Sequence, residues 1–267
     1  MIGRYINKKC NQEKERVYSE MVKLVNDSDI NLRIEYFNGS FSMNFKSHIF
    51  KRLFLNGDYE KDLIAKVEKY IPSDKDIIDV GANIGLFTTL FAKKTDKTVF
   101  AAEPTDGAYS YLIKNIKTNN LNNVITFKGV IDEIEGDKYI NFIDGNEEYS
   151  SLSEINHPSV SDKNKEKLKV QSMRIDDAVK LHNLNPGFIK IDVEGAEMNV
   201  LKSMIKTIKE FKPVIMCEVV DYMLENFNSS SKELFSLLNE SGYEIIILDK
   251  HNRNSDKFIG NILAVAK

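Results

Sequence analysis

The chain has 267 residues, of which 42% are hydrophobic and 29% charged, ordinary usage for a globular protein with one large domain and a small extension. A formal net charge of −3 and a pI of about 5.9 give no electrostatic sign of a nucleic-acid partner. No run approaches the roughly 18 apolar residues of a membrane span, and no apolar signal segment opens the chain, so we expect a cytoplasmic protein.

The first 57 residues predict an N-terminal extension made of one helix and one β-hairpin. Residues 12–26 carry apolar side chains at helical spacing. Two alternating runs, 32–37 and 40–45, flank Asn38-Gly39, a dipeptide typical of hairpin turns. The extension would cover a site, build specificity, form a dimer contact or simply pack on the edge of a sheet. The sequence leaves these four roles open.

From residue 58 onward helical and strand patterns alternate, which predicts an α/β domain over residues 58–267. We expect helices over 58–70, 84–94, 107–118 and 175–181, another from about 196, and one opened by a capping box at Ser230 and Glu233. We expect strands over 77–80, 98–103, 124–127, 139–143, 170–174, 188–192, 214–219, 243–248 and 259–266. The polar stretch 144–169 is predicted to be a flap over the site or a solvated insertion. The last two strands are joined by a short loop, so they should pair antiparallel.

The first chemical signal is a strand that ends in Asp79, turns through small residues and continues as a helix. Gly81 and Gly85 allow the backbone to approach a ligand at the positive end of that helix. Asn83 stands where glycine is common, and Asn tolerates positive φ well. The spacing departs from the G-x-G-x-x-G pattern of dinucleotide-binding folds.

The second signal is Glu103, which ends the next strand and lies 22 residues after Gly81. A carboxylate at about this distance along the chain accepts hydrogen bonds from the two hydroxyls of a ribose. The same charge would repel a 2′-phosphate, which argues against a ligand of the NADP type.

The third signal is the segment 188–197, where a buried strand carries Lys190 and Asp192 and is followed by Glu194 and Glu197. With Asp79–Gly85 and Glu103-Pro104, this segment resembles the FkbM-type family of S-adenosylmethionine-dependent methyltransferases. The resemblance runs from about residue 58 to the C-terminus, and the block 190–197 is its most specific part.

The resemblance implies a class I methyltransferase fold: a Rossmann-like, doubly wound sheet, mostly parallel, with a C-terminal antiparallel hairpin. It implies S-adenosylmethionine as cofactor, with Glu103 on the ribose diol and Asp79 and Asp192 near the cationic amino group and sulfonium. The N–H groups of the Gly81–Gly85 turn would bind the cofactor carboxylate. Val130 and Asp132, placed by fold analogy, would flank the adenine. Tyr59-Glu60 would either lie near the cofactor or only supply a carboxylate at the start of a helix.

For the chemistry we favour Asp192 or Glu194 as base or acceptor anchor, because a hydroxyl acceptor must lose its proton. Lys190 would hold the charge balance, paired with Asp192 or Glu218, since a lysine in an apolar strand needs a partner. In the alternative interpretation, Glu194 and Glu197 only stabilise the start of a helix.

We assign no metal ligands. Clustered carboxylates could hold Mg²⁺, but no histidine stands among them, which disfavours zinc and iron. Of the four histidines only His157, in the long loop, is placed to approach an acceptor. Cys10 and Cys217 share no metal-ligand spacing, and Cys217 is expected to be a buried hydrophobe.

The sequence therefore predicts a methyltransferase that methylates the hydroxyl oxygen of a sugar, a glycan precursor or a natural product, with no nucleic-acid partner. An NAD-type oxidoreductase is the first alternative, disfavoured by the glycine pattern and the terminal hairpin. A catalytically silent binding protein on the same fold is the second, disfavoured because the acids at 103, 192, 194 and 197 are all present. The acceptor and the oligomeric state stay open.

Overall fold

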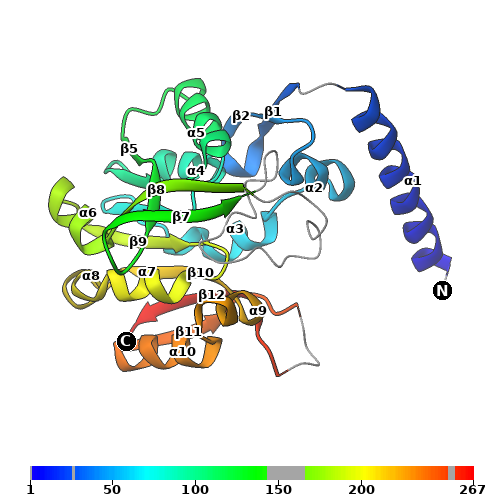
Figure 1. Cartoon of the computed structure of the whole chain (residues 1–267). Helices are drawn as coiled ribbons and strands as arrows, with labels where there is room; N and C mark the ends of the chain where they lie inside the picture. Colours follow the sequence, from blue (N-terminus) through cyan, green and yellow to red (C-terminus); the bar gives the residue numbers. More distant parts are fainter. Residues whose placement is uncertain (1, 26–27, 143–165, 252–255) are drawn as a thin grey trace.

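The computed structural model describes residues 2–25, 28–142, 166–251 and 256–267 (Figure 1). Most of the predicted flap at 144–169, with His157, lies outside the described residues. Its last residues belong to a strand, β8 (Glu166–Met173).

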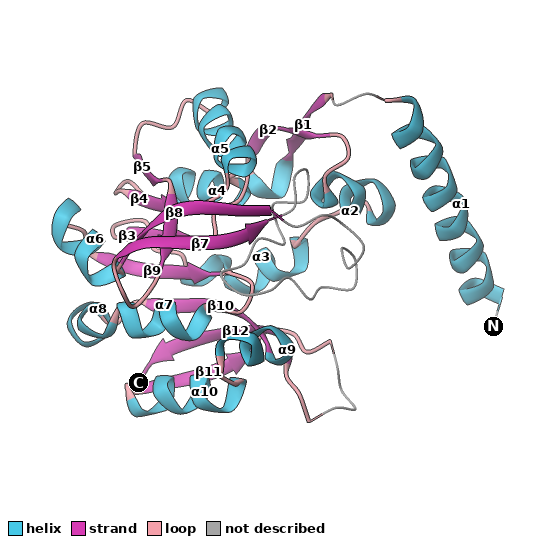
Figure 2. Ribbon diagram, in the orientation of Figure 1, coloured by secondary structure: helices cyan, strands magenta, loops and turns pink. Residues whose placement is uncertain are grey.

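A seven-stranded sheet forms the centre of the molecule, in the order β11-β12-β10-β9-β3-β4-β5 (Figure 2). Its parallel strands are β3 (Asp76–Val80), β4 (Val99–Ala102), β5 (Val124–Phe127), β9 (Pro186–Ile191) and β10 (Val214–Val220). β12 (Ile259–Ala266) runs antiparallel to both β10 and β11 (Tyr243–Ile247). The predicted sheet and its C-terminal hairpin are confirmed. The strand order reverses between β3 and β9, which is where open α/β sheets bind ligands.

Successive strand residues point to opposite faces of the sheet, as the two-residue period of a strand requires, and contribute to a separate hydrophobic core on each face. Ile77 and Phe188 pack with α3 (Lys61–Val67), α4 (Leu86–Lys94) and the N-terminal extension. Ile78 and Ile189 pack on the other face, against the helices α6 (Ile175–His182), α7 (Glu197–Ser203), α8 (Ile205–Phe211) and α10 (Ser231–Glu240). Both faces are therefore covered, which explains why these strands are mostly apolar.

The N-terminal extension contains α1 (Ile2–Leu24), a hairpin of β1 (Asp29–Ile34) and β2 (Gly39–Asn44), and α2 (His48–Asn56). The predicted hairpin is confirmed, but a 3₁₀ turn at Glu35–Phe37 precedes Asn38, so the connection is longer than two residues. α2 was not predicted from the sequence; Ser47 caps its start and Gly57 its end.

Two asparagines join this hairpin to α5 (Asp106–Thr118). The Asn115 side chain accepts from Ser42 N at 2.7 Å and donates to Ser42 O at 3.1 Å. Asn119, just beyond the helix, does the same with the N–H and C=O of Ser40. Four residues along a helix and two along a strand both advance by roughly 6 to 7 Å, so the two amides pair with β2 as a neighbouring strand would.

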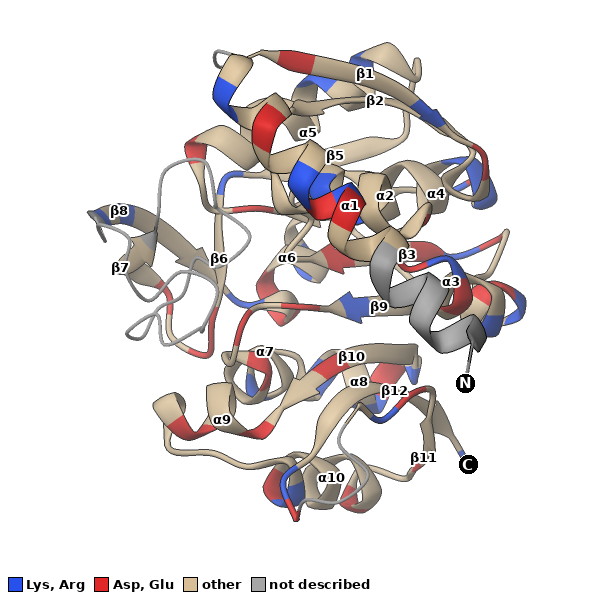
Figure 3. Cartoon of the chain, turned by 90° about the vertical axis from the view of Figure 1, so that its right-hand side faces the viewer, with Lys and Arg blue, Asp and Glu red and all other residues tan. Residues whose placement is uncertain are grey.

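Further differences from the predicted elements are local. A three-stranded sheet, β6-β8-β7, contains β6 (Gly129–Ile131), which was not predicted, and β7 (Gly136–Phe142), which begins earlier than expected. The helix predicted from 196 is broken at Met204 into α7 and α8, and a short α9 (Asp221–Leu224) follows β10. The capping box before α10 is confirmed, with Ser230 accepting from Glu233 N. Acidic and basic residues are interspersed over the elements in Figure 3, as the small net charge indicates.

Candidate active site

A cavity of about 340 Å³ opens at the carboxyl ends of β3, β4, β9 and β10. Its walls include most of the predicted site residues: Gly81, Asn83, Glu103, Val130, Lys190, Asp192 and Glu194. Glu218 from the end of β10 lines it as well. The sequence signals at four separate strand ends therefore meet in one place.

The turn between β3 and α4 is left-handed at Gly81 (φ 77), Asn83 (φ 50) and Gly85 (φ 86). A Cβ at Gly81 would lie 1.8 Å from the carbonyl oxygen of Asp192, so only glycine fits between the two strand ends. Gly85 does not line the cavity, and a Cβ there would meet Leu112.

The backbone N–H groups of this turn are already engaged. Gly81 and Ala82 donate to Ala102 O, and Gly85 donates to Ala82 O. Asn83 N donates to Glu103, and Ile84 N to the Asn83 side chain. These five N–H groups thus stabilise the turn itself.

Glu103 is held rigidly at the end of β4. Its Oε1 accepts from Thr105 N at 3.0 Å and Thr105 Oγ1 at 2.6 Å, and its Oε2 accepts from Asn83 N at 2.9 Å. Burial raises the pKa of this carboxyl, and the bonds from Thr105 and Asn83 act against that rise. A carboxylate has about four acceptor positions, so the side chain keeps capacity for a ligand in the cavity.

Lys190 lies buried between two carboxylates. Its Nζ is 3.4 Å from Asp79 Oδ1 and 3.3 Å from Asp192 Oδ2, and it donates to Gly81 O at 3.1 Å. Burial alone would lower the pKa of Lys190, but Asp192 and Asp79 raise it above its usual value, which keeps the ammonium charged. The predicted pairing with Asp192 is confirmed, and Asp79 is a partner that the sequence analysis did not name.

Two predicted cofactor residues, Asp79 and Asp132, do not line the cavity. Asp79 is fully buried, and Thr88 Oγ1 donates to its Oδ2 at 2.6 Å. Asp132 is 3% exposed and accepts from Ile134 N and Lys138 Nζ. Both carboxylates have partners within the protein, so neither is placed to bind a ligand in the cavity.

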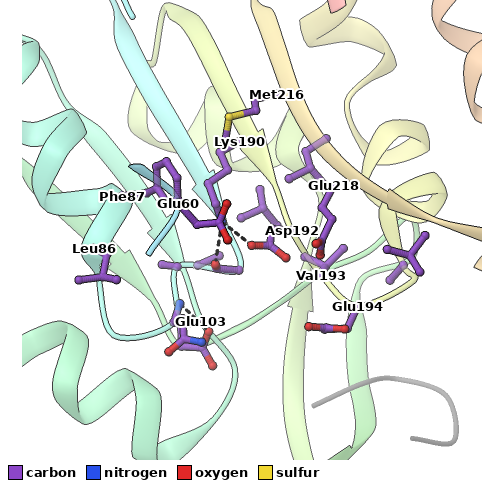
Figure 4. Close-up of a pocket in the computed structure, with 18 of the residues that line it drawn as sticks. Glu60, Leu86, Phe87, Glu103, Lys190, Asp192, Val193, Glu194, Met216 and Glu218 are labelled. Carbon is purple, nitrogen blue, oxygen red and sulfur yellow. Dashed lines mark hydrogen bonds and ion pairs between the residues drawn. The ribbon is translucent and has the colours of Figure 1, made fainter. Parts of the chain in front are cut away.

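Asp192, Glu194 and Glu218 form the acidic side of the cavity, and carboxylate oxygens from all three lie within 4.8 Å of one another. Figure 4 shows Asp192 and Glu218 facing each other, with Glu194 nearby. Burial raises the pKa of Glu218 well above its usual range, and the charges of Asp192 and Glu194 raise it further. We call these three residues the acid trio.

Glu197 lies behind this wall. Its Oε1 accepts from Gly195 N at 3.0 Å and Val193 N at 3.3 Å, and Oε2 has no hydrogen-bond partner among the described residues. Burial raises its pKa to about 7. Glu197 thus fixes the loop that carries Glu194, whose backbone is left-handed (φ 54). Glu197 lies in the first turn of α7, where the alternative interpretation expects it to stabilise the start of the helix.

The extension supplies another wall, which the sequence did not specify. His48 and Arg52 of α2 line the cavity together with Tyr59 and Glu60. Arg52 pairs with Glu60 at 3.0 Å, and its guanidinium lies 4.7 Å from the centre of the Tyr59 ring. The extension therefore both packs on the main domain and supplies part of the cavity wall. His157, the histidine expected near an acceptor, lies outside the described residues, and His48 is the histidine that lines the cavity within them.

The sheet order, the glycine turn after β3 and the acid after β4 define a class I methyltransferase fold. The family model for the methyltransferase FkbM domain matches residues 79–245, more than half of the chain. The protein therefore belongs to the FkbM methyltransferase family.

The curated relatives align over part of their length. "Methyltransferase 1" of Beauveria bassiana is 27% identical over 148 residues, which cover 50% of this chain and 59% of the relative. The tRNA(Phe) (4-demethylwyosine(37)-C(7)) aminocarboxypropyltransferase of Methanocaldococcus jannaschii is 39% identical over 83 residues, 30% of this chain and 32% of that protein. Among solved structures, methyltransferase FkbM from Methylobacillus flagellatus has 17% identity and a TM-score of 0.49, covering 81% of this chain and 52% of that one.

Within the described residues, no helix is long and apolar enough to cross a membrane.

Proposed function

We propose that the protein is an S-adenosylmethionine-dependent methyltransferase that methylates a hydroxyl oxygen on a sugar, a glycan precursor or a natural product. One observation carries the proposal: Glu103 and the glycine turn share a single cavity with Asp192, Glu194 and Glu218. A nucleoside-binding end and an acid–base end thus lie within reach of one another.

The residues at the first end suit the cofactor. Glu103 would accept from the ribose diol, and Val130 would contact the adenine. Leu86 and Phe87 open α4 and line the cavity, and the first N–H groups of a helix have no partner within that helix. Because the N–H groups of the glycine turn already have partners, we assign those of Leu86 and Phe87 as donors for the cofactor carboxylate, at the positive end of the helix. When bound, S-adenosylmethionine supplies an electrophilic methyl group on a sulfonium.

The residues at the second end suit proton removal. A hydroxyl would lose its proton as its oxygen forms a bond to the methyl carbon and the bond from that carbon to the sulfonium sulfur breaks, leaving a neutral thioether. A carboxylate of Asp192 or Glu194 would accept that proton. Lys190 places one positive charge between Asp79 and Asp192 and so reduces the repulsion between the two carboxylates at the strand ends. The negative charge of Asp192 would also favour a cationic sulfonium at this end of the cavity. Positioning the acceptor oxygen roughly 3–3.5 Å from the methyl carbon would provide much of the acceleration.

The cofactor assignment is tested by calorimetric titration with S-adenosylmethionine, S-adenosylhomocysteine and NAD⁺. We expect binding on the order of micromolar for the first two and none for NAD⁺. Glu103→Ala should weaken both adenosyl ligands at least tenfold, whereas Glu133→Ala, about half exposed and outside the cavity, should leave them unchanged. Binding of NAD⁺ alone would favour the oxidoreductase, and binding of none of the three would favour a silent binding protein.

Turnover is tested by transfer of a labelled methyl group to a panel of sugar nucleotides, glycans and natural products. Asp192→Asn should abolish transfer on any acceptor found while leaving the thermal unfolding transition cooperative. Normal turnover in that variant would show that Asp192 is neither base nor acceptor anchor.

A further inference from the structure

We propose that the acceptor carries a protonated amine, as an amino sugar or an aminated natural product does, and that the acid trio binds this ammonium group. The inference rests on the proposed function, because it takes the acidic side of the cavity to be the acceptor side. It adds a substrate class that can be tested apart from methyl transfer.

The charge of the cavity is the first observation. Among the described residues, five carboxylates and the basic groups of Arg52 and Lys190 line it, a formal charge of −3 with His48 taken as neutral. The carboxylates are those of Glu60, Glu103, Asp192, Glu194 and Glu218. Both basic groups already face carboxylates, Arg52 with Glu60 and Lys190 with Asp79 and Asp192. Bound S-adenosylmethionine, with sulfonium, ammonium and carboxylate, would add a single positive charge. A neutral acceptor would leave a surplus of negative charge in a partly buried space.

The acid trio concentrates that surplus. Its oxygens lie within 4.8 Å of one another, a distance at which like charges repel strongly away from bulk water. Burial is the first cause of the raised pKa of Glu218, and the charges of Asp192 and Glu194 add to it, which is this repulsion acting on one residue. An ammonium group has three N–H donors and one positive charge, and would relieve the repulsion by bridging the carboxylates.

The surroundings favour an organic cation over a metal ion. The Lys190 ammonium lies 3.3 Å from Asp192, a fixed positive charge that opposes a divalent ion more strongly than a monovalent one. Tyr59, Tyr222, Met216 and Met223 also line the cavity. Aromatic rings and thioethers pack well against an alkylammonium, whereas Mg²⁺ keeps a shell of oxygen ligands and water.

The first test measures binding rather than turnover, so that it does not require the true acceptor. Glucosamine and kanamycin, and the N-acetylated form of each, would be titrated into the protein saturated with S-adenosylhomocysteine. We expect each amine to bind at least tenfold more tightly than its acetylated counterpart. Equal binding of the two forms, tighter binding of the neutral forms, or no binding of either amine would overturn the proposal.

Variants locate the site. The double variant Glu194→Gln/Glu218→Gln keeps size and hydrogen-bonding groups, and should remove the preference for the amine while leaving the affinity for S-adenosylhomocysteine within about twofold. Glu133→Gln, outside the cavity, should change neither. An equal loss of cofactor affinity in the double variant would assign the acid trio to the cofactor and overturn the proposal. Thermal melts of all variants confirm that each is folded.

Two further outcomes separate the alternatives. If millimolar MgCl₂ displaced the amine in the wild type but not from the double variant, the acid trio would be a metal site and the proposal would fall. If the amine bound with the expected preference to a protein that bound no adenosyl ligand, the cation site would stand and the methyltransferase proposal would fall.

Discussion

Lys190 is the residue on which the charge of the site depends. It is 4% exposed, and Asp79 beside it is fully buried, so each requires the other in the apolar interior of the sheet. Register explains the contact: Asp79 of β3 pairs directly with Lys190 of the parallel neighbour β9. The ammonium also lies 5.4 Å from the centre of the Phe87 ring, on the cavity side.

Removing this ammonium should be costly. Lys190→Met leaves Asp79 as a buried charge without its ion-pair partner and should lower the free energy of unfolding by about 3–5 kcal/mol. Lys190→Met/Asp79→Asn, which removes both charges, should recover most of that loss. Urea unfolding followed by circular dichroism measures both. A single variant as stable as the wild type, or a double variant no more stable than the single one, would contradict the role given to the pair.

The pKa of Glu197 makes stability depend on pH. Its folded pKa of about 7 lies above the ordinary glutamate pKa of 4.5, so between these values the folded protein holds a proton that the unfolded chain releases. The stabilisation is complete below about pH 4.5 and is lost as the pH rises through 7, amounting to about 3 kcal/mol at 1.36 kcal/mol per pKa unit. Glu197→Gln should flatten this part of the stability curve. Urea midpoints at pH 5.5 and 8.5 check it, with Glu240→Gln, an exposed acid, as control.

At the residue scale, the sequence located the strand-end acids but not the direction of every side chain. Glu103, Lys190, Asp192 and Glu194 line the cavity as expected, because the carboxyl ends of parallel strands meet at one edge of the sheet. Asp79 also ends a strand, yet its side chain is buried, and only the three-dimensional pairing with Lys190 reveals why. Arg52 and His48 carried no motif, so nothing local marked them as part of the site.

At the scale of elements, the β3–α4 turn links sequence to site most tightly. Gly81 N donates to Ala102 O, and a Cβ on Gly81 would collide with the backbone carbonyl of Asp192. The turn therefore holds three strand ends in place at once. A side chain here would disturb the turn, Lys190 and Asp192 together.

Substituting two glycines with similar φ angles distinguishes backbone strain from a steric clash of the added Cβ. Gly81→Ala should destabilise the protein by several kcal/mol, roughly as overpacking in a core does, and should abolish cofactor binding, because its Cβ would lie 1.8 Å from Asp192 O. Gly242→Ala has a similar φ of +87 and nothing within 4 Å of its Cβ, so it should cost only about 1–2 kcal/mol and leave cofactor affinity unchanged. Thermal melts and calorimetry on both variants decide the matter. Equal effects of the two would show that backbone strain, and not the contact with Asp192, governs the turn.

Elements with a long apolar pattern were predicted correctly, whereas short elements that depend on contacts with distant parts of the chain were not. The strands and helices of the main domain follow apolar periodicity and capping residues. β6 has three residues and exists because it pairs with β8, which lies about forty residues further on. α2 packs against α1 and fills the core beside Tyr18, a contact that no local pattern encodes.

At the scale of the whole molecule, the N-terminal extension belongs to the same body as the main domain. Tyr18, Phe37, Phe41 and Phe50 share a core with Ile77 and Phe91 of the main domain. Asn115 completes the link, because it bonds Ser42 of β2 and also donates to Ile84 O at 2.8 Å, inside the glycine turn. The hairpin that covers the core is thus tied to the backbone that shapes the cofactor end of the cavity.

Replacing this asparagine should uncouple the two parts. Asn115→Ala leaves the N–H and C=O of Ser42 and the C=O of Ile84 without this partner in a fully buried place, at roughly 1–3 kcal/mol for each group that finds no other. We expect the free energy of unfolding to fall by at least about 3 kcal/mol and the affinity for S-adenosylhomocysteine to fall with it, because the turn loses a support. Asn119→Ala is the matched control: it removes the same pair of bonds one helical turn away, at Ser40, in a partly exposed place and without contact to the turn. It should lower stability by about 1 kcal/mol and leave cofactor affinity unchanged. If both variants lost stability equally and neither lost affinity, the extension would be packed on the main domain without bearing on its site.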